Sequence, residues 1–258
     1  MEWRKLKELF INQSIFLFSD FWAVQRRFIQ RHLKEFGYAR RGMREICENE
    51  AEFCLKHLLK LVEQQGGKSA TIVMPNLFAM NVLNTIWLMM AGIRYDSDNE
   101  DLKLLQEILT DLFASVDMMG ALFSHFPFLR FIAPNASGYN SFMSCHNKIH
   151  AFVRREVENH KKTFKPSDEP RDLIDAYLKV LYSGDENESG KIDESFSEQQ
   201  LLAVCLDIFM SGSETTSKSA NFMFLHMIRN PEIQKKARQE IDRVVGNGRL
   251  PTLEDRIK

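Results

Sequence analysis

Residues 206–217 read LDIFMSGSETTS and lie in the middle of one long helix that the surrounding pattern predicts. Apolar residues recur at spacings of three and four on both sides of this stretch, as expected for a helix with a buried face. Ser197, with Gln200 three positions later, fits a capping box and sets the start of the helix. Asn230-Pro231 fits the start of the next helix. The helix between them is roughly 45–50 Å long at about 1.5 Å per residue, enough to cross a whole domain.

Gly212, Thr215 and Thr216 are unusual residues for the interior of a helix. Together they cost roughly 1–2 kcal/mol relative to alanine, so their placement indicates a local role. A glycine at 212 would let a ligand approach the backbone. A threonine hydroxyl at 215 would bond to a carbonyl one turn earlier, which would loosen the helix and open a notch. The alternative is a tolerated glycine in a helix bent against its neighbours, and the stretch alone is compatible with both interpretations.

The rest of the chain also predicts helices, because no segment shows sustained strand alternation. The most apolar run, residues 77–93, is interrupted by Asn81 and Asn84 and is shorter than the ~20 residues of a membrane span, so it predicts a buried helix. We therefore expect a mainly α fold. The helices predicted by periodicity are Phe21–Phe36, Met43–Val62, Pro75–Ala91, Leu102–Met118, Phe142–His160, Leu173–Leu181, Ser197–Arg229 and Pro231–Val245.

Trp22 and Arg26 are four residues apart and would share one face of the first predicted helix. An indole N–H and a guanidinium on one face can both donate hydrogen bonds to the same carboxylate. Taken alone, the pair is more typical of an aromatic anchor beside a solvated arginine.

Residues 26–44 are strongly basic, although the chain as a whole has a formal net charge of −1. This segment holds seven lysines and arginines and one acid, Glu35. The neutral overall balance gives no attraction to nucleic acid, and we expect no nucleic-acid partner. Arg27, Arg31 and Lys34 would share one helical face, which is either a docking surface for an acidic partner or an ordinary solvated face.

The string Ser211-Gly212-Ser213-Glu214-Thr215-Thr216 resembles the (Ala/Gly)-Gly-x-(Asp/Glu)-Thr-Thr motif of the cytochrome P450 family, the haem-thiolate monooxygenases, and departs from it only at Ser211. Residues 230–242 resemble the next helix of that family, and residues 249–256 repeat its Arg-x-Pro-x-x-x-Asp-Arg pattern. Residues 22–26 match its Trp-x-x-x-Arg helix. The sequence is most similar to animal microsomal members of arthropod type.

The resemblance implies roles for five residues around a haem. Gly212 would make room for dioxygen, and Glu214 and Thr215 would organise proton delivery. Trp22 and Arg26 would donate to a haem propionate. In this interpretation the Trp22 and Arg26 pair is a cofactor-binding feature rather than a surface anchor.

The resemblance also implies partners. A small apolar substrate would be oxidised with electrons from NADPH, delivered by the NADPH–cytochrome P450 reductase, which would dock on Arg27, Arg31 and Lys34. Residues 113–142, rich in Phe and Met, would roof the substrate pocket and dip into the membrane surface, or would form ordinary core. The expected location of the parent enzyme is the cytosolic face of the endoplasmic reticulum membrane.

The matched portion is internal to that family's fold. We expect one partial domain over residues 1–258, the central helical part, without the β-rich regions and the segment that carries the haem-ligand cysteine. The four cysteines lack the surroundings of that ligand, so no metal ligand is predicted and they are interpreted as reduced core thiols. The cysteines are Cys47, Cys54, Cys145 and Cys205.

The parent enzyme would insert one oxygen atom from O2 into its substrate, and this chain alone would be inactive. The alternative is a non-catalytic helical binding module.

Overall fold

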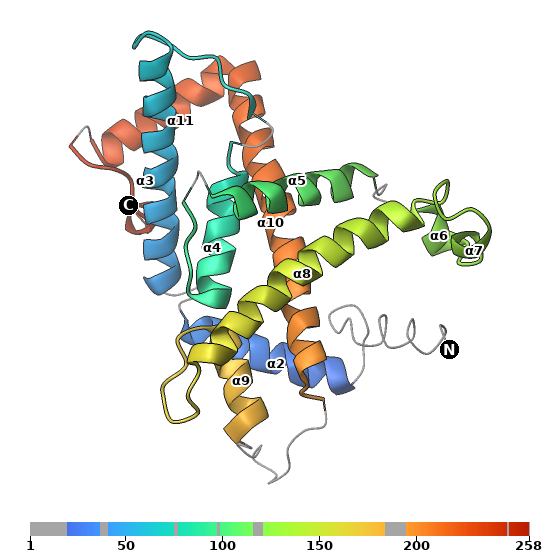
Figure 1. Cartoon of the computed structure of the whole chain (residues 1–258). Helices are drawn as coiled ribbons and strands as arrows, with labels where there is room; N and C mark the ends of the chain where they lie inside the picture. Colours follow the sequence, from blue (N-terminus) through green and yellow to red (C-terminus); the bar gives the residue numbers. More distant parts are fainter. Residues whose placement is uncertain are drawn as a thin grey trace.

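The computed structural model describes residues 20–36, 41–74, 77–96, 99–115, 121–183, 195–246 and 248–257. Within these ranges the chain forms helices joined by loops, which confirms the expected mainly α fold (Figure 1). The helices are α2 (Asp20–Glu35), α3 (Arg41–Gln64), α4 (Ala79–Ala91), α5 (Glu100–Ser115), α6 (Leu122–His125), α7 (Leu129–Ile132), α8 (Tyr139–Thr163), α9 (Leu173–Ser183), α10 (Glu198–Arg229), α11 (Pro231–Val244) and the 3-10 helix η2 (Leu253–Ile257).

Helix α10 has the predicted bounds, but its caps differ in detail from the prediction. The Ser197 side chain accepts a hydrogen bond from the Gln200 backbone N–H at 3.1 Å. The Gln200 side chain is buried and has no hydrogen-bond partner among the described residues, so only half of the capping box forms. At the other end, the Asn230 side chain donates to the His226 carbonyl at 2.8 Å. Asn230 therefore closes α10, and α11 begins with Pro231 at its first position but without a side-chain cap.

Several predicted boundaries are wrong by a few residues. Helix α8 begins at Tyr139, three residues before Phe142, because Gly138 adopts the left-handed conformation (φ 80°) that ends the preceding loop. Between Pro127 and Pro134, a stretch with no predicted helix, the chain forms the single turn of α7. The predicted helix start at Pro75 and helix end at Met118 lie outside the described residues.

The core lies where α4 packs along α10 (Figure 1). Trp87 of α4 is 1% exposed, and its ring meets Phe209 of α10 edge-on, with the ring centroids 5.8 Å apart. Phe152 of α8 packs against the same indole at 5.1 Å. The apolar run at residues 77–93 thus forms the predicted buried helix. Among the described helices, none combines the length and the apolar character needed to cross a membrane.

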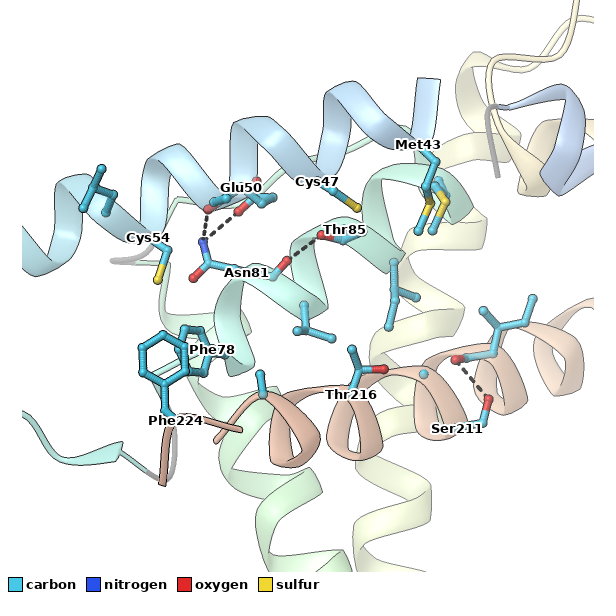
Figure 2. A pocket seen from close by; sticks show the side chains of 18 of the residues that line it. Met43, Cys47, Glu50, Cys54, Phe78, Asn81, Thr85, Ser211, Thr216 and Phe224 are labelled. Atoms are coloured by element: carbon cyan, nitrogen blue, oxygen red, sulfur yellow. Dashed lines mark hydrogen bonds between the residues drawn. The ribbon is translucent and has the colours of Figure 1, made fainter. Parts of the chain in front are cut away.

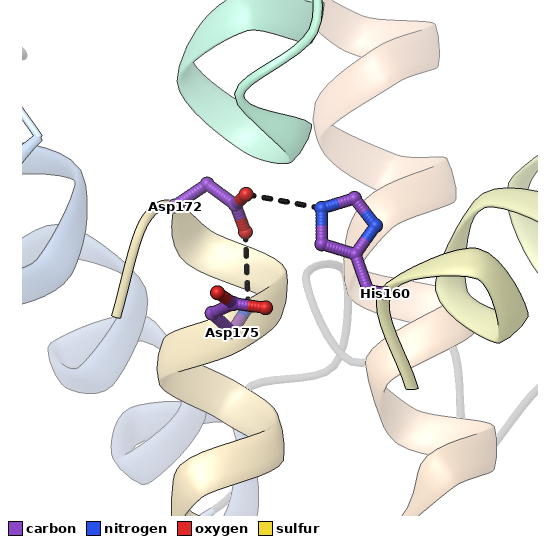
Figure 3. A group of neighbouring side chains, drawn as sticks. All are labelled: His160, Asp172 and Asp175. Atoms are coloured by element: carbon purple, nitrogen blue, oxygen red, sulfur yellow. Dashed lines mark hydrogen bonds and ion pairs between the residues drawn. The ribbon is translucent and has the colours of Figure 1, made fainter. Parts of the chain in front are cut away.

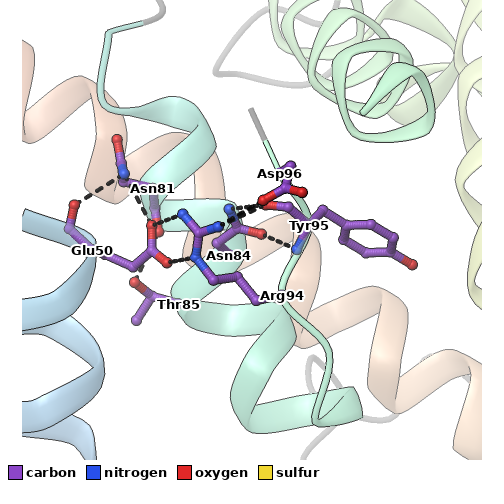
Figure 4. A network of polar contacts seen from close by, with 7 residues as sticks. All are labelled: Glu50, Asn81, Asn84, Thr85, Arg94, Tyr95 and Asp96. Atoms are coloured by element: carbon purple, nitrogen blue, oxygen red, sulfur yellow. Dashed lines mark hydrogen bonds and ion pairs between the residues drawn. The ribbon is translucent and has the colours of Figure 1, made fainter. Parts of the chain in front are cut away.

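A polar network joins α3 to the two ends of α4 (Figure 4). The buried Glu50 carboxylate accepts from Arg94 Nε at 2.6 Å and from Asn81 Nδ2 at 3.0 Å. Asn84 is bonded to the backbone of Tyr95 in both directions, at 2.8 and 3.0 Å. The two asparagines that interrupt the apolar run therefore fix α3 and the chain after α4 to this helix.

His160 lies at the junction of α4, α8 and α9 (Figure 3). Its Nδ1 is 2.8 Å from the Glu156 carbonyl, and its Nε2 is 3.1 Å from the Ala91 carbonyl and 3.0 Å from Asp172 Oδ2. Every one of these partners is an acceptor, so both ring nitrogens must carry a proton and the imidazole is a cation. Asp172 in turn accepts from the Asp175 backbone N–H at 2.9 Å, at the start of α9.

The same three side chains, His160, Asp172 and Asp175, are close enough to suggest a metal site. However, the Asp175 carboxylate is bound by the Arg171 guanidinium, with Nη2 2.9 Å from Oδ1. The His160 nitrogens already donate to the acceptors named above. The group is therefore a buried ion-pair cluster that holds three helices together.

Raising the pH should weaken this cluster. Burial lowers the pKa of His160, but the hydrogen bond and charge of Asp172 outweigh it and hold the pKa above its usual value. The stabilisation is complete below the unfolded-state pKa of about 6.5 and is lost as the pH rises through the higher folded-state value. In urea titrations at increasing pH, the free energy of unfolding should fall in this window. His160→Gln should remove that fall, and His57→Gln, at an exposed position of α3, should preserve it. Equal slopes for the wild type and His160→Gln would contradict the assignment.

Candidate functional site

A cavity of about 740 Å³ lies between α3, α4 and α10 (Figure 2). The polar groups on its wall are few, and Glu50 and Asn81 are bonded to each other. Such a space suits an apolar molecule or an apolar segment of protein. Its apolar wall includes Met43, Cys54, Phe78, Val82, Met89 and Phe224.

Gly212 forms part of this wall and packs directly against Ile86 of α4. A Cβ atom at residue 212 would lie 2.9 Å from Ile86 Cδ1, closer than real Cβ contacts allow. The glycine therefore lets α10 approach α4. The expected approach of a ligand at 212 stays a prediction, and the packing role is an additional finding that no local sequence signal could reveal.

Thr215 makes the predicted bond to the preceding turn, with its Oγ1 donating to the Ser211 carbonyl at 2.6 Å. Helix α10 continues without interruption through this turn, so the expected notch is not formed. Because the hydroxyl proton is used by the carbonyl, the exposed Thr215 can offer only its lone pairs to an incoming group. Thr216 points into the cavity instead (Figure 2).

Glu214 lies on a different side of the same turn. The residue is 8% exposed and its carboxylate forms an ion pair with Lys218 Nζ at 2.9 Å. The motif thus combines a cavity-lining glycine, a buried acid and an exposed hydroxyl. The partner Lys218 was not singled out from the sequence, although its spacing of four from Glu214 is the signal that could have identified it.

Trp22 and Arg26 share one face of α2, as predicted. The Arg26 guanidinium lies over the Trp22 ring at 5.0 Å from its centroid. Between them in sequence, the buried Gln25 fixes the rotation of α2: it donates to Ser195 Oγ at 3.1 Å and accepts from the Tyr177 hydroxyl at 3.0 Å. Gln25 was not predicted, because its partners are 152 and 170 residues away.

Arg27, Arg31 and Lys34 are all exposed on α2, and we call them the basic face. Gln25 and Ile29 of the same helix are buried. The three cations are exposed, and their role as a common docking surface and the partner that would bind there stay predictions.

The four cysteines are free, as predicted. Cys54 and Cys205 are buried, whereas Cys47 and Cys145 are partly exposed. Burial raises the pKa of all four thiols, which keeps them protonated at neutral pH.

Comparison with known proteins places these features in a family. The sequence pattern of the cytochrome P450 family matches residues 3–258. A probable cytochrome P450 303a1 of Drosophila melanogaster is 49% identical over 232 residues, 90% of this chain and 45% of that protein. A farnesoate epoxidase of Bombyx mori is 35% identical over 244 residues, 94% of this chain and 47% of that protein. Human cytochrome P450 2J2 is 33% identical over 236 residues, which are 90% of this chain and 44% of that protein. The chain spans less than half the length of these relatives.

The contact between Gly212 and Ile86 can be tested by a double-mutant cycle. Gly212→Ala should lower the free energy of unfolding by about 1–2 kcal/mol through overpacking. In an Ile86→Val background, which lacks the clashing Cδ1, the same change should be neutral or stabilising by up to about 1 kcal/mol, because alanine favours the helix. Urea unfolding of the four proteins measures the coupling. Additive effects would show that the glycine is not there for Ile86.

Proposed function

The chain belongs to the cytochrome P450 family, and on this premise we propose that it acts as part of a monooxygenase that inserts one oxygen atom from O2 into a small apolar substrate. The second oxygen atom would be reduced to water with electrons from NADPH. The observation that supports this best is the single turn of α10 that carries Gly212, which lines an apolar cavity, the buried Glu214 and the exposed Thr215. One of the matched relatives is named as an epoxidase of farnesoate, which is consistent with an apolar substrate.

Haem is the cofactor of this family, and the residues present fit it. Trp22 and Arg26 offer an indole N–H and a guanidinium on one face of α2, a donor set suited to a propionate. Thr215 presents an exposed hydroxyl. When bound, the haem supplies the iron that activates oxygen.

Proton delivery is the work proposed for the residues of α10. The lone pairs of the Thr215 hydroxyl would accept a hydrogen bond from a water molecule and hold it in place. Glu214, buried one residue earlier, would supply the proton that this water passes inward. The glycine at 212 would leave room for that exchange.

The basic face would receive the acidic surface of the reductase. Complementary charge of this kind raises the rate of encounter more than the final affinity. The exposed position of all three cations supports this role.

The membrane surface would contact α6 and α7. These short helices and their connection expose large apolar side chains to solvent: Leu122, Phe126, Phe128, Phe131 and Ile132. Aromatic and aliphatic groups gathered in this way favour the headgroup boundary of a bilayer. This surface would hold the parent enzyme at the cytosolic face of the endoplasmic reticulum.

A second candidate applies to the 258 residues by themselves. None of their four cysteines has the sequence surroundings of the family's haem-ligand cysteine. By themselves they would be catalytically inactive and would act as a helical module that binds apolar ligands in the cavity.

Thr215→Ala in the holoenzyme should separate oxygen consumption from product formation. Removing the hydroxyl leaves the water unheld, so product per NADPH should fall by about tenfold while NADPH oxidation continues. Haem content and the carbon monoxide difference spectrum should be unchanged. Thr216→Ala is the matched control and should be milder, because its side chain points about 100° away along the helix. Damage by Thr216→Ala alone would transfer the role to the cavity-lining threonine.

Reversing the charge of the basic face should weaken the encounter with the reductase. Arg27→Glu, Arg31→Glu and Lys34→Glu together should raise the reductase concentration needed for half-maximal turnover, and more so at low salt, where screening beyond about 10 Å is relaxed. The same reversal at the exposed Lys235 and Lys236 of α11 should have no such effect. A half-maximal concentration that is unchanged at every ionic strength would leave the basic face as ordinary solvated surface.

A further inference from the structure

Lys218 connects the buried acid of α10 to solvent. Its Nζ lies 2.9 Å from Glu214 Oε1, one helical turn away. The Lys218 side chain is 52% exposed, whereas the Glu214 side chain is 11% exposed. The ion pair therefore runs from the interior to the surface.

The ammonium is also held from a second helix. Lys218 Nζ lies 5.8 Å from the centre of the Phe113 ring on α5, within the range of a cation–π contact. An ammonium has three N–H donors, and one of them is given to Glu214. Since half of the side chain is exposed, water can reach the remaining donors. Glu214 is thus joined to bulk water through a group whose position is fixed on two sides.

An ion pair between two exposed side chains at a spacing of four contributes little, because water solvates both charges when the pair is broken. The difference here is the burial of the acid. Without Lys218, the carboxylate would lose its cation in a place that water reaches poorly, and it would have to turn outward or give up its charge. Either change removes the carboxylate from the position beside Thr215.

We propose that Lys218 is a positioning residue for proton delivery, which holds the Glu214 carboxylate where it can take a proton from solvent. This rests on the proposed function. In the step concerned, an O–H bond of a hydronium ion breaks and an O–H bond forms on a carboxylate oxygen of Glu214. Glu214 would then give that proton to the water held by Thr215 and return to its ionised form. This water would release one of its own protons to the oxygen atom that is reduced to water, so the charges of the ion pair and of the held water are both restored.

The test uses the holoenzyme with Lys218→Met, which keeps the length of the side chain but removes its charge. Product per NADPH should fall by about tenfold, less than the full contribution of an acid–base group. The solvent deuterium isotope effect on product formation should increase, because proton uptake becomes slower. The KM for substrate should not change. A crystal structure of the variant should show the Glu214 carboxylate turned away from its wild-type position, a result that does not depend on turnover. Lys218→Arg should restore coupling.

The chain contains a matched control on α3. Lys56 Nζ lies 2.7 Å from the carboxylate of Glu52, four residues earlier, and 5.7 Å from the centre of the Phe53 ring. The ring distance is close to the 5.8 Å between Lys218 Nζ and the Phe113 ring. The acid Glu52 is 46% exposed. Lys56→Met therefore removes the same contacts from an exposed acid, and it should leave coupling and the isotope effect unchanged.

Three outcomes would overturn the inference: coupling unchanged by Lys218→Met, a Glu214 carboxylate that keeps its place in that variant, or an equal loss in Lys56→Met. The proposed function fails in a different way, through a wild-type holoenzyme that forms no oxygenated product. An unchanged Lys218→Met beside a damaged Thr215→Ala would reject Lys218 and keep the monooxygenase.

Discussion

The two central helices, α4 and α10, meet at a contact between Gly212 and Ile86, where α10 presents no side chain. Ile86 Cδ1 occupies the space that a Cβ atom would need. This approach brings Trp87 against Phe209, and α8 closes over the same indole through Phe152. Because interiors are packed as densely as organic crystals, a wider spacing here would be transmitted to every element that packs on α4. The cavity beside Gly212 is bounded by the same two helices, so its shape depends on the same contact.

Buried polar groups then fix the surrounding helices to this core. Glu50 holds α3 against α4 and the segment after it, and Gln25 sets the rotation of α2. His160 joins the end of α4 to α8 and α9. A buried polar group is unfavourable unless it is paired, so each of these arrangements tolerates little displacement. The orientation of the Trp22 and Arg26 face is a consequence of Gln25 rather than of either residue.

The sequence predicted the features that depend on neighbours along the chain. The extent of α10, the Ser197 cap, the buried character of α4 and the bond from Thr215 to the Ser211 carbonyl all follow from local spacing and propensity. The features that it could not predict depend on partners far away in the chain. Gly212 meets a side chain 126 residues earlier, and nothing near either residue indicates this. The prediction for Asn230 was wrong although its partners are nearby in the chain. Its side chain could cap the end of α10 or the start of α11, and it caps the end of α10.

Helical geometry explains how one turn can serve three environments. Successive residues are rotated by about 100°, so a glycine, an acid two positions later and a threonine three positions later face different sides. In this chain Gly212 faces α4 and the cavity, Glu214 is buried beside Lys218, which reaches α5, and Thr215 is exposed. The acid and the hydroxyl are adjacent in sequence, so their side chains leave the helix about 100° apart. Because the helical backbone fixes the spacing of these three residues, their relative positions do not change when the helices packed on α10 move. The lysine one turn beyond the acid belongs to the same rigid element, and this is why the acid and its link to water keep their relation to the threonine.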